Sequence, residues 1–149
     1  MELTANRFFT SEQKEHILQA IHKAEKDTSG EIKVHLERLC TGNVLDRAAQ
    51  IFHELGMSQT ELRNGVLIYL AYQERKFAIL GDAGINAAVT SNFWDDIKVH
   101  MQSKFRAGHF AEGIIEGVEM VGQQLKDHFP YKTSGDQNEL SDEISFGEN

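Results

Sequence analysis

The sequence predicts an α/β fold built on a mixed β-sheet, and three observations support that prediction. An alternating polar and apolar segment, Glu31–Glu37, is followed by a helical pattern at Val44–Leu55 and then by the apolar run Val66–Tyr72. The order strand, helix, strand predicts a right-handed parallel crossover. A charged turn then returns the chain through Phe77–Leu80, which we expect to lie antiparallel to the preceding strand.

Composition and charge fit one globular domain. The chain has 149 residues, of which 40% are hydrophobic and 26% charged, enough for one substantial core. Its net charge of −8 argues against nucleic acid as a partner. The single cysteine, Cys40, favours a reducing compartment. The sequence shows neither a secretory signal nor an apolar run of spanning length, so we expect a cytoplasmic protein without direct membrane insertion.

The first helix and the strands have recognisable local signals. Thr10 and Gln13 form a capping-box pattern at the start of a helix, and Gly30 near its end is available for a positive φ. The alternation in Glu31–Glu37 is typical of a half-buried strand. The nearly continuous apolar run Val66–Tyr72 is typical of a strand covered on both faces.

The second half of the chain is helical. Ser91 is a candidate N-cap for a helix that extends to Phe105, and a second helix is expected over Phe110–Phe129. Gly113 and Gly117 lie one turn apart in that second helix. Because glycine inside a helix costs about 1 kcal/mol relative to alanine, their presence predicts a neighbouring element packed unusually close to them.

The chain divides into two parts by composition. Residues 1–131 carry the predicted strands and helices and form one domain. Residues 132–149 are polar and acidic, with Ile144 and Phe146 as isolated apolar residues, and we expect this tail to be mostly disordered.

Three glycine-bearing polar turns are expected to meet at one end of the sheet. The parallel strands begin there and the antiparallel strand ends there, which brings together Ser29–Glu31, Arg63–Gly65 and Gly81–Ala83. Glycines beside a carboxylate and an amide suit a small cation or anion site. The same residues are also ordinary strand caps, and the sequence leaves both interpretations open.

Several short motifs together resemble the TPM domain family. These motifs are Ser29–Glu31 opening a strand, Arg63–Ile68, the turn Gly81–Gly84, and Phe105–Phe110 followed by Gly113. The resemblance spans roughly residues 8–129. It implies a three-layer α/β/α sandwich, Rossmann-like in outline, with helices on both faces of a mixed sheet. It also implies divalent-cation binding, particularly of calcium, acid phosphatase activity in some members, and an accessory role beside membrane complexes in others.

Five oxygen-bearing side chains are the candidate metal ligands: Glu31, Asn64, Asp82, Asp95 and Asp96. Calcium or magnesium ions require several such oxygens. Each candidate also has an ordinary structural interpretation. Glu31 fits an exposed strand edge, Asp82 an Asx turn, and the Asp95–Asp96 pair a helix start, where the helix dipole alone favours carboxylates.

Three hypotheses of function follow. The first is a binding or accessory module that takes a divalent cation at the turns and has a possible protein partner. The second is a metal-dependent acid phosphatase in which Arg63 or His109 steadies the phosphate. Arg63 can instead pair with Glu31 or Asp82. The third is a structural interaction domain without a metal site.

Overall fold

The structure is a computed structural model that describes residues 4–90, 92–131 and 144–147. Its helices and strands, in chain order, are α1 (Ala5–Phe8), α2 (Ser11–Glu25), β1 (Glu31–Glu37), α3 (Val44–Glu54), the 3₁₀ helix η1 (Met57–Gln59), β2 (Gly65–Ala71), β3 (Lys76–Gly81), α4 (Ala83–Asn86), α5 (Asp95–Arg106), α6 (Phe110–His128) and β4 (Ser145–Phe146).

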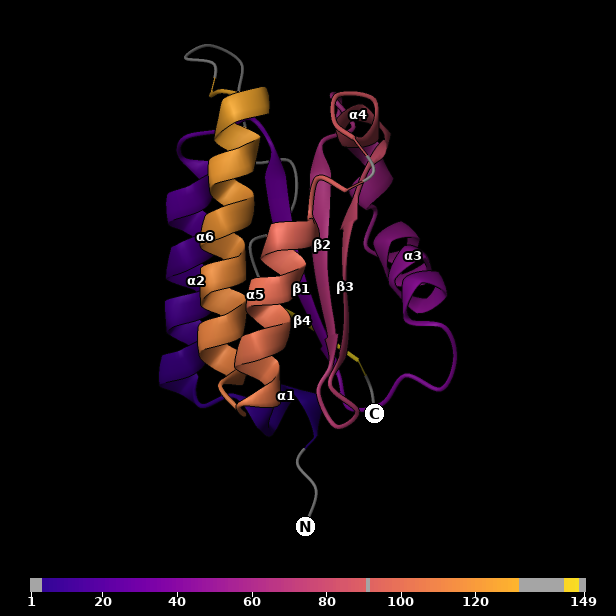
Figure 1. The fold of residues 1–149 in the computed structure, drawn as a ribbon, viewed down its shortest axis with the longest axis vertical. Helices are drawn as coiled ribbons and strands as arrows, with labels where there is room; N and C mark the ends of the chain where they lie inside the picture. The colour runs from indigo at the N-terminus through magenta and orange to yellow at the C-terminus, as the bar shows by residue number, and fades with distance from the viewer. Residues whose placement is uncertain (1–3, 91, 132–143, 148–149) are drawn as a thin grey trace.

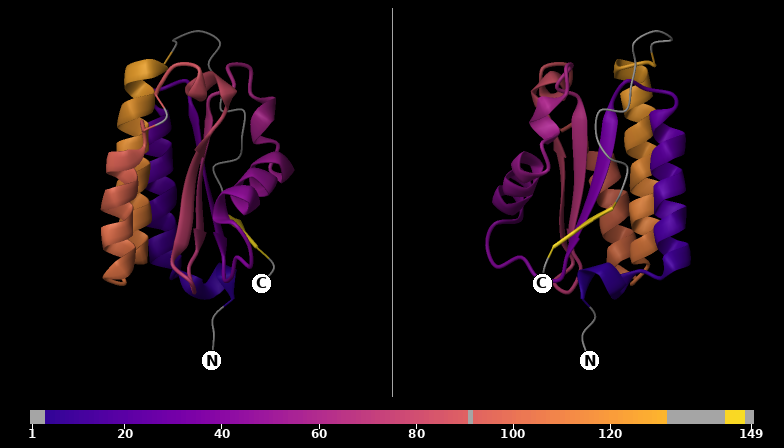
Figure 2. Two further views of the ribbon diagram at one scale, coloured as in Figure 1. Left: turned by 45° about the vertical axis from the view of Figure 1, so that its right-hand side comes forward. Right: turned by 180° about the vertical axis from the view of Figure 1, so that it is seen from behind.

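A mixed sheet forms the middle layer of a three-layer sandwich. Its strand order is β3-β2-β1-β4, with β1 parallel to both β2 and β4 and β3 antiparallel to β2. Helices α2, α5 and α6 cover one face and α3 covers the other (Figures 1 and 2). The predicted α/β/α architecture is therefore confirmed. Within the described ranges, no helix combines the length and apolarity that crossing a membrane requires.

Strand β1 is buried more completely than its sequence predicts. All seven of its residues are buried, including the polar side chains that alternate with Ile32, Val34 and Leu36. The expectation of a half-buried strand is wrong because the helices on both faces cover it. The polar residues of β1 face α3, so they must find partners inside the protein.

Local signals near the first helix are confirmed in part. The Thr10 hydroxyl accepts a hydrogen bond from the Gln13 amide at 3.1 Å, and the Gln13 side chain accepts one from the Thr10 amide at 3.0 Å, completing the capping box. Gly30 does not have a positive φ. A Cβ on Gly30 would lie 3.0 Å from Leu125 Cδ1, so this glycine allows close packing against α6.

Two expected boundaries differ in the structure. Helix α5 begins at Asp95, with Trp94 at its N-cap, whereas the proposed cap Ser91 lies outside the described residues. In the C-terminal part, residues 132–143 and 148–149 also lie outside the described ranges. The intervening residues 144–147 lie beside β1, where Ser145 and Phe146 form β4, so the expected disorder does not extend to these residues.

Gly113 and Gly117 of α6 confirm the predicted close approach. A Cβ on Gly113 would lie 2.6 Å from the Phe105 ring, and one on Gly117 would lie 2.5 Å from Met101 Sδ. Both neighbours belong to α5 and are buried. Glycine at these positions therefore sets the separation of α5 and α6.

We expect Gly113→Val to lower the free energy of unfolding by about 1–3 kcal/mol, because the added methyls would collide with the buried Phe105 ring. The matched control is Glu119→Val, which introduces the same side chain at an exposed position of α6. Urea unfolding of both variants measures the difference. Equal stability of the two variants would contradict this account of the α5–α6 contact.

Candidate functional site

The three polar turns meet at one end of the sheet, as predicted. The Glu31 amide donates to the Asn64 carbonyl at 3.3 Å, and the Asp82 amide donates to the Gly65 carbonyl at 3.0 Å. The Gly84 amide donates to the Arg63 carbonyl at 2.8 Å. We call these residues, 29–31, 63–65 and 81–84, the turn cluster. Its backbone is tied together by the strand register.

An ion pair between Arg63 and Asp82 dominates the turn cluster. Arg63 Nε lies 2.7 Å from Asp82 Oδ2, and Arg63 Nη2 lies 2.8 Å from Oδ1, so the guanidinium contacts both carboxylate oxygens. Asp82 is 6% exposed, whereas the Arg63 side chain is 47% exposed. Of the two partners left open for Arg63, the structure selects Asp82.

Asp82 remains ionised despite its burial. Burial by itself raises the pKa of this carboxyl, but the hydrogen bonds from Arg63 and from the Ala83 amide outweigh burial and hold its pKa below the ordinary value. The Ala83 amide lies 2.7 Å from Oδ1, so Asp82 also caps the short helix α4. The ion-pair interpretation holds, and the side chain caps a backbone amide, although that amide is one residue on and not the two residues on of an Asx turn.

The backbone of residues 62–63 packs directly against Gly84 because this glycine has no side chain. A Cβ on Gly84 would lie 2.1 Å from the Leu62 carbonyl oxygen and 2.7 Å from that of Arg63. Only glycine permits this approach. The turn before β2 and the turn after β3 are therefore packed against each other at Gly84.

Glu31 and Asn64 lie at the same end of the sheet but are differently placed. Both are buried, and Asn64 Nδ2 donates to Ser29 Oγ at 3.4 Å. The register sets Glu31 and Asp82 on either side of Gly65. Met57 packs over Gly65, where a Cβ would meet its Cε at 3.4 Å. Met57 therefore packs on the strand residue that separates Glu31 from Asp82 in the sheet.

Asp95 and Asp96 are exposed in the first turn of α5. No hydrogen bond or ion pair joins either carboxylate to the turn cluster. Over the described part of the chain, no three His, Cys, Asp or Glu side chains are grouped so that they could hold a metal ion. The structure thus brings Glu31, Asn64 and Asp82 to one end and leaves Asp95 and Asp96 on the surface.

His109, the second residue considered for a phosphate, lies at the opposite end of the molecule. It occupies the N-cap position of α6 and is exposed. That end adjoins the β2–β3 turn, since Arg75 donates to the Arg106 carbonyl at 3.4 Å. Figure 1 shows α6 starting at the end of the sheet away from α4. His109 and Arg63 therefore cannot contact the same phosphate.

A second polar cluster, which the sequence analysis missed, lies between β1 and α3. Glu37, 1% exposed, accepts hydrogen bonds from Arg47 Nε at 3.0 Å and from the Tyr69 hydroxyl at 2.5 Å, and Arg47 Nη2 contacts its other oxygen. His35 Nε2 lies 3.2 Å from Glu37 Oε1. We call these four residues the Glu37 cluster. The sequence signal that could have revealed this cluster was the set of polar residues that alternate with apolar ones in β1.

Burial and pairing shift the protonation equilibria of the Glu37 cluster. Burial lowers the pKa of His35, an effect that the neighbouring Glu37 opposes in part. Burial raises the pKa of Glu37, but Arg47, Tyr69 and His35 outweigh it and hold that pKa below its ordinary value. Burial and the Glu37 carboxylate both raise the pKa of Tyr69.

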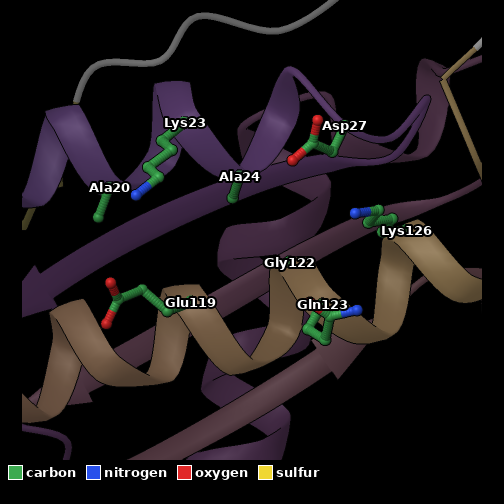
Figure 3. A pocket seen from close by; sticks show the side chains of 8 residues that line it. All are labelled: Ala20, Lys23, Ala24, Asp27, Glu119, Gly122, Gln123 and Lys126. Carbon is green, nitrogen blue, oxygen red and sulfur yellow. The ribbon is translucent and has the colours of Figure 1, made fainter.

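A surface furrow between α2 and α6 is explained by packing alone. Figure 3 shows Ala20 and Ala24 of α2 facing Gly122 of α6, with charged side chains at the margins of the furrow. A Cβ on Gly122 would lie 2.6 Å from the Ala24 Cβ. These small residues let the two helices pack closely and present no group that points to a ligand.

The fold and the turn cluster define an α/β/α sandwich whose polar turns gather at one end of a mixed sheet. The family model for the TPM domain matches residues 4–124. The chain belongs to the TPM domain family, as the sequence motifs indicated. None of the curated proteins compared with the chain matches it.

Solved structures support the same assignment. The chain is 46% identical to the BA42 protein from the psychrophilic bacterium Bizionia argentinensis, whose NMR structure it matches with a TM-score of 0.88, over 94% of this chain and 96% of that one.

Two other solved structures, each the N-terminal domain of a bacterial protein, are similar to this chain in fold alone. For the P. gingivalis domain the identity is 22% and the TM-score 0.67, over 81% of this chain and 78% of that one. For the cg2496 protein of Corynebacterium glutamicum the identity is 17% and the TM-score 0.66, over 91% and 84%.

Replacing Tyr69 with Phe tests the Glu37 cluster. The hydroxyl donates to a buried carboxylate, so its loss should lower the free energy of unfolding by about 1.5–3 kcal/mol. Tyr131→Phe, at a 48% exposed tyrosine, is the matched control and should change it little. Denaturant unfolding measures both. A Tyr69→Phe variant as stable as the control would contradict the role given to this hydrogen bond.

Acid should destabilise the protein in two stages. Folding lowers the pKa of His35, so the stability it contributes is lost as the pH falls below its ordinary pKa of about 6.5. Folding also lowers the pKa values of Glu37 and Asp82, so a second loss follows below about pH 4.5.

The first stage can be assigned with one substitution. In His35→Gln, the decline in the urea midpoint between about pH 7 and pH 5 should become shallower, whereas substitution of the exposed His16 by Gln should leave the slope unchanged. An unchanged slope in His35→Gln would show that another group titrates in this range.

Proposed function

We propose that this TPM domain binds a hard divalent cation, Ca²⁺ or Mg²⁺, at the turn cluster and acts as a binding or accessory module. The observation that carries the proposal is the buried carboxylate of Asp82, two residues before Gly84, whose backbone packs against the carbonyl groups of Leu62 and Arg63. Carboxylate and backbone carbonyl oxygens are the ligands that these cations take in proteins.

Arg63 would act as an internal competitor of the cation. Its guanidinium contacts both oxygens of Asp82, so cation binding requires that this contact open. The Arg63 side chain is almost half exposed and can move into water, whereas Asp82 is held in place by the Ala83 amide. Replacement of the guanidinium by a divalent cation leaves the buried carboxylate with a positively charged partner.

The other predicted ligands contribute unequally to this proposal. Asn64 adjoins the Arg63 carbonyl in sequence and can supply an amide oxygen. Glu31 pairs with Gly65 from the other side of β2, so its carboxylate would have to reach across that strand. Asp95 and Asp96 are exposed and would have to approach Asp82 from α5. We therefore rank Asp82 first and treat Asp95 and Asp96 as ligands to be tested.

Calcium and magnesium titrations followed by amide NMR shifts test the proposal. We expect saturable shifts at residues 63–65 and 81–84, lost in Asp82→Asn. Arg63→Gln should bind the cation about twofold to fivefold more tightly, because a guanidinium that is almost half exposed no longer competes for Asp82. Shifts absent from these residues in the natural chain would favour the interaction domain without a metal site.

Two controls separate the ligands from general charge effects. Asp46→Asn removes an exposed carboxylate from the first turn of α3 and should leave the affinity unchanged. Asp96→Asn shows whether α5 contributes a ligand. An Asp82→Asn variant with the natural affinity would contradict the proposal, whatever the outcome at Asp96.

The acid phosphatase alternative uses the same cation and needs Arg63 free to meet a phosphoryl oxygen. Turnover of a generic phosphomonoester, lost in Asp82→Asn and kept in Asp46→Asn, would support that alternative. His109 lies at the start of α6, at the end of the molecule opposite the turn cluster. Its substitution should therefore not affect such turnover.

A further inference from the structure

The outer edge of β1 already carries an extended segment from the C-terminal part of the chain. Ser145 pairs with His35 and Phe146 with Leu36 in parallel register, and the Gly147 amide donates to the Leu36 carbonyl at 2.7 Å. This is the geometry of strand addition, in which backbone hydrogen bonds attach an extended peptide to a sheet edge. Residues 144–147 lie beyond the part of the chain that the family model matches.

Two apolar anchors hold the segment on the α2 side of the sheet. Ile144 is buried in the main hydrophobic core, and Phe146 packs against the same core. The Lys14 ammonium of α2 lies 5.1 Å from the centre of the Phe146 ring, a cation–π contact. The first and third positions of the segment therefore require an apolar and an aromatic side chain.

The alternate positions face the Glu37 cluster. Ser145 Oγ lies 2.8 Å from His35 Nδ1, so the hydroxyl and the imidazole share a hydrogen bond. A Cβ on Gly147 would lie 2.5 Å from Glu37 Cγ, which leaves room only for glycine. A groove between β1 and α3 passes beneath this segment and is lined by His35, Glu37, Arg47 and Leu55.

We infer that the outer edge of β1 is a docking site for an extended peptide of pattern apolar–Ser–aromatic–Gly on a partner protein, and that residues 144–147 occupy this site in cis. Each position of the pattern matches a contact of the resident segment. With two strand pairs, the resident segment is attached by few backbone bonds and can be exchanged. This inference concerns an edge of the sheet that the proposed cation site does not use.

The test compares peptide binding to the natural chain and to a full-length chain whose own segment is displaced. The probe is a synthetic peptide of residues 143–149, EISFGEN. In Phe146→Asp, the aromatic anchor is lost and the edge becomes accessible, so the probe should shift the amides of residues 34–36. Its affinity should be about tenfold or more higher than for the natural chain, where the attached segment competes at an effective concentration on the order of mM.

A matched peptide carrying Gly147→Val tests whether the site selects peptides that have the proposed pattern. Its added methyls would meet Glu37, so it should bind Phe146→Asp about tenfold or more weakly than the probe, in line with the cost of overpacking. A second full-length variant, Gly147→Val, displaces the segment without removing an apolar anchor. It should accept the probe as Phe146→Asp does, which keeps the test valid if one variant unfolds.

Three outcomes would overturn the inference. The probe could fail to bind both displaced variants, bind the natural chain equally well, or bind no better than its Gly147→Val counterpart. Light scattering that shows a dimer of the natural chain, with its segment exchanged between copies, would overturn the cis assignment. Thermal unfolding of each variant confirms that the comparison is made between folded proteins.

Discussion

The buried carboxylate of Glu37 is the constraint on which the arrangement around β1 depends. A carboxylate removed from water costs several kcal/mol unless cations and hydrogen-bond donors surround it. Arg47 from α3 and Tyr69 from β2 supply them, and His35 Nε2 of β1 lies 3.2 Å from the same carboxylate. Helix α3 must therefore dock where Arg47 reaches β1. His35 in turn bonds Ser145, so one carboxylate links both neighbours of β1 and the helix above it.

Buried carboxylates are neutralised in different ways near the two ends of β1. At the carboxyl end, Glu37 is enclosed by several donors and its partners are themselves mostly buried. At the amino end, Asp82 is neutralised by a guanidinium whose side chain is almost half exposed. The enclosed Glu37–Arg47 pair is suited to holding the sheet and α3 together. In the Asp82–Arg63 pair, the half-exposed guanidinium can give way to another cation, which is why the proposed cation site lies at the amino end.

Much of the fold was predictable because its signals are local. Thr10 and Gln13 satisfy backbone groups within one turn, so the capping box was readable without any tertiary information. Gly113 and Gly117 indicated close packing because their helical cost needs compensation. The burial of Glu37 was not readable in this way, since its partner Arg47 lies on a separate helix and the polar alternation of β1 is equally typical of a strand facing water.

The sequence by itself determined the order of strands and helices, the parallel crossover and the meeting of three polar turns, because chain connectivity and handedness leave few alternatives. Only the tertiary structure decided which partner Arg63 takes. The antiparallel register sets Asp82 opposite Gly65, while Glu31 pairs with Gly65 from the other side of β2. The tertiary structure likewise decided that residues 144–147 add a strand, because their isolated apolar side chains gain burial only against a core built by distant segments.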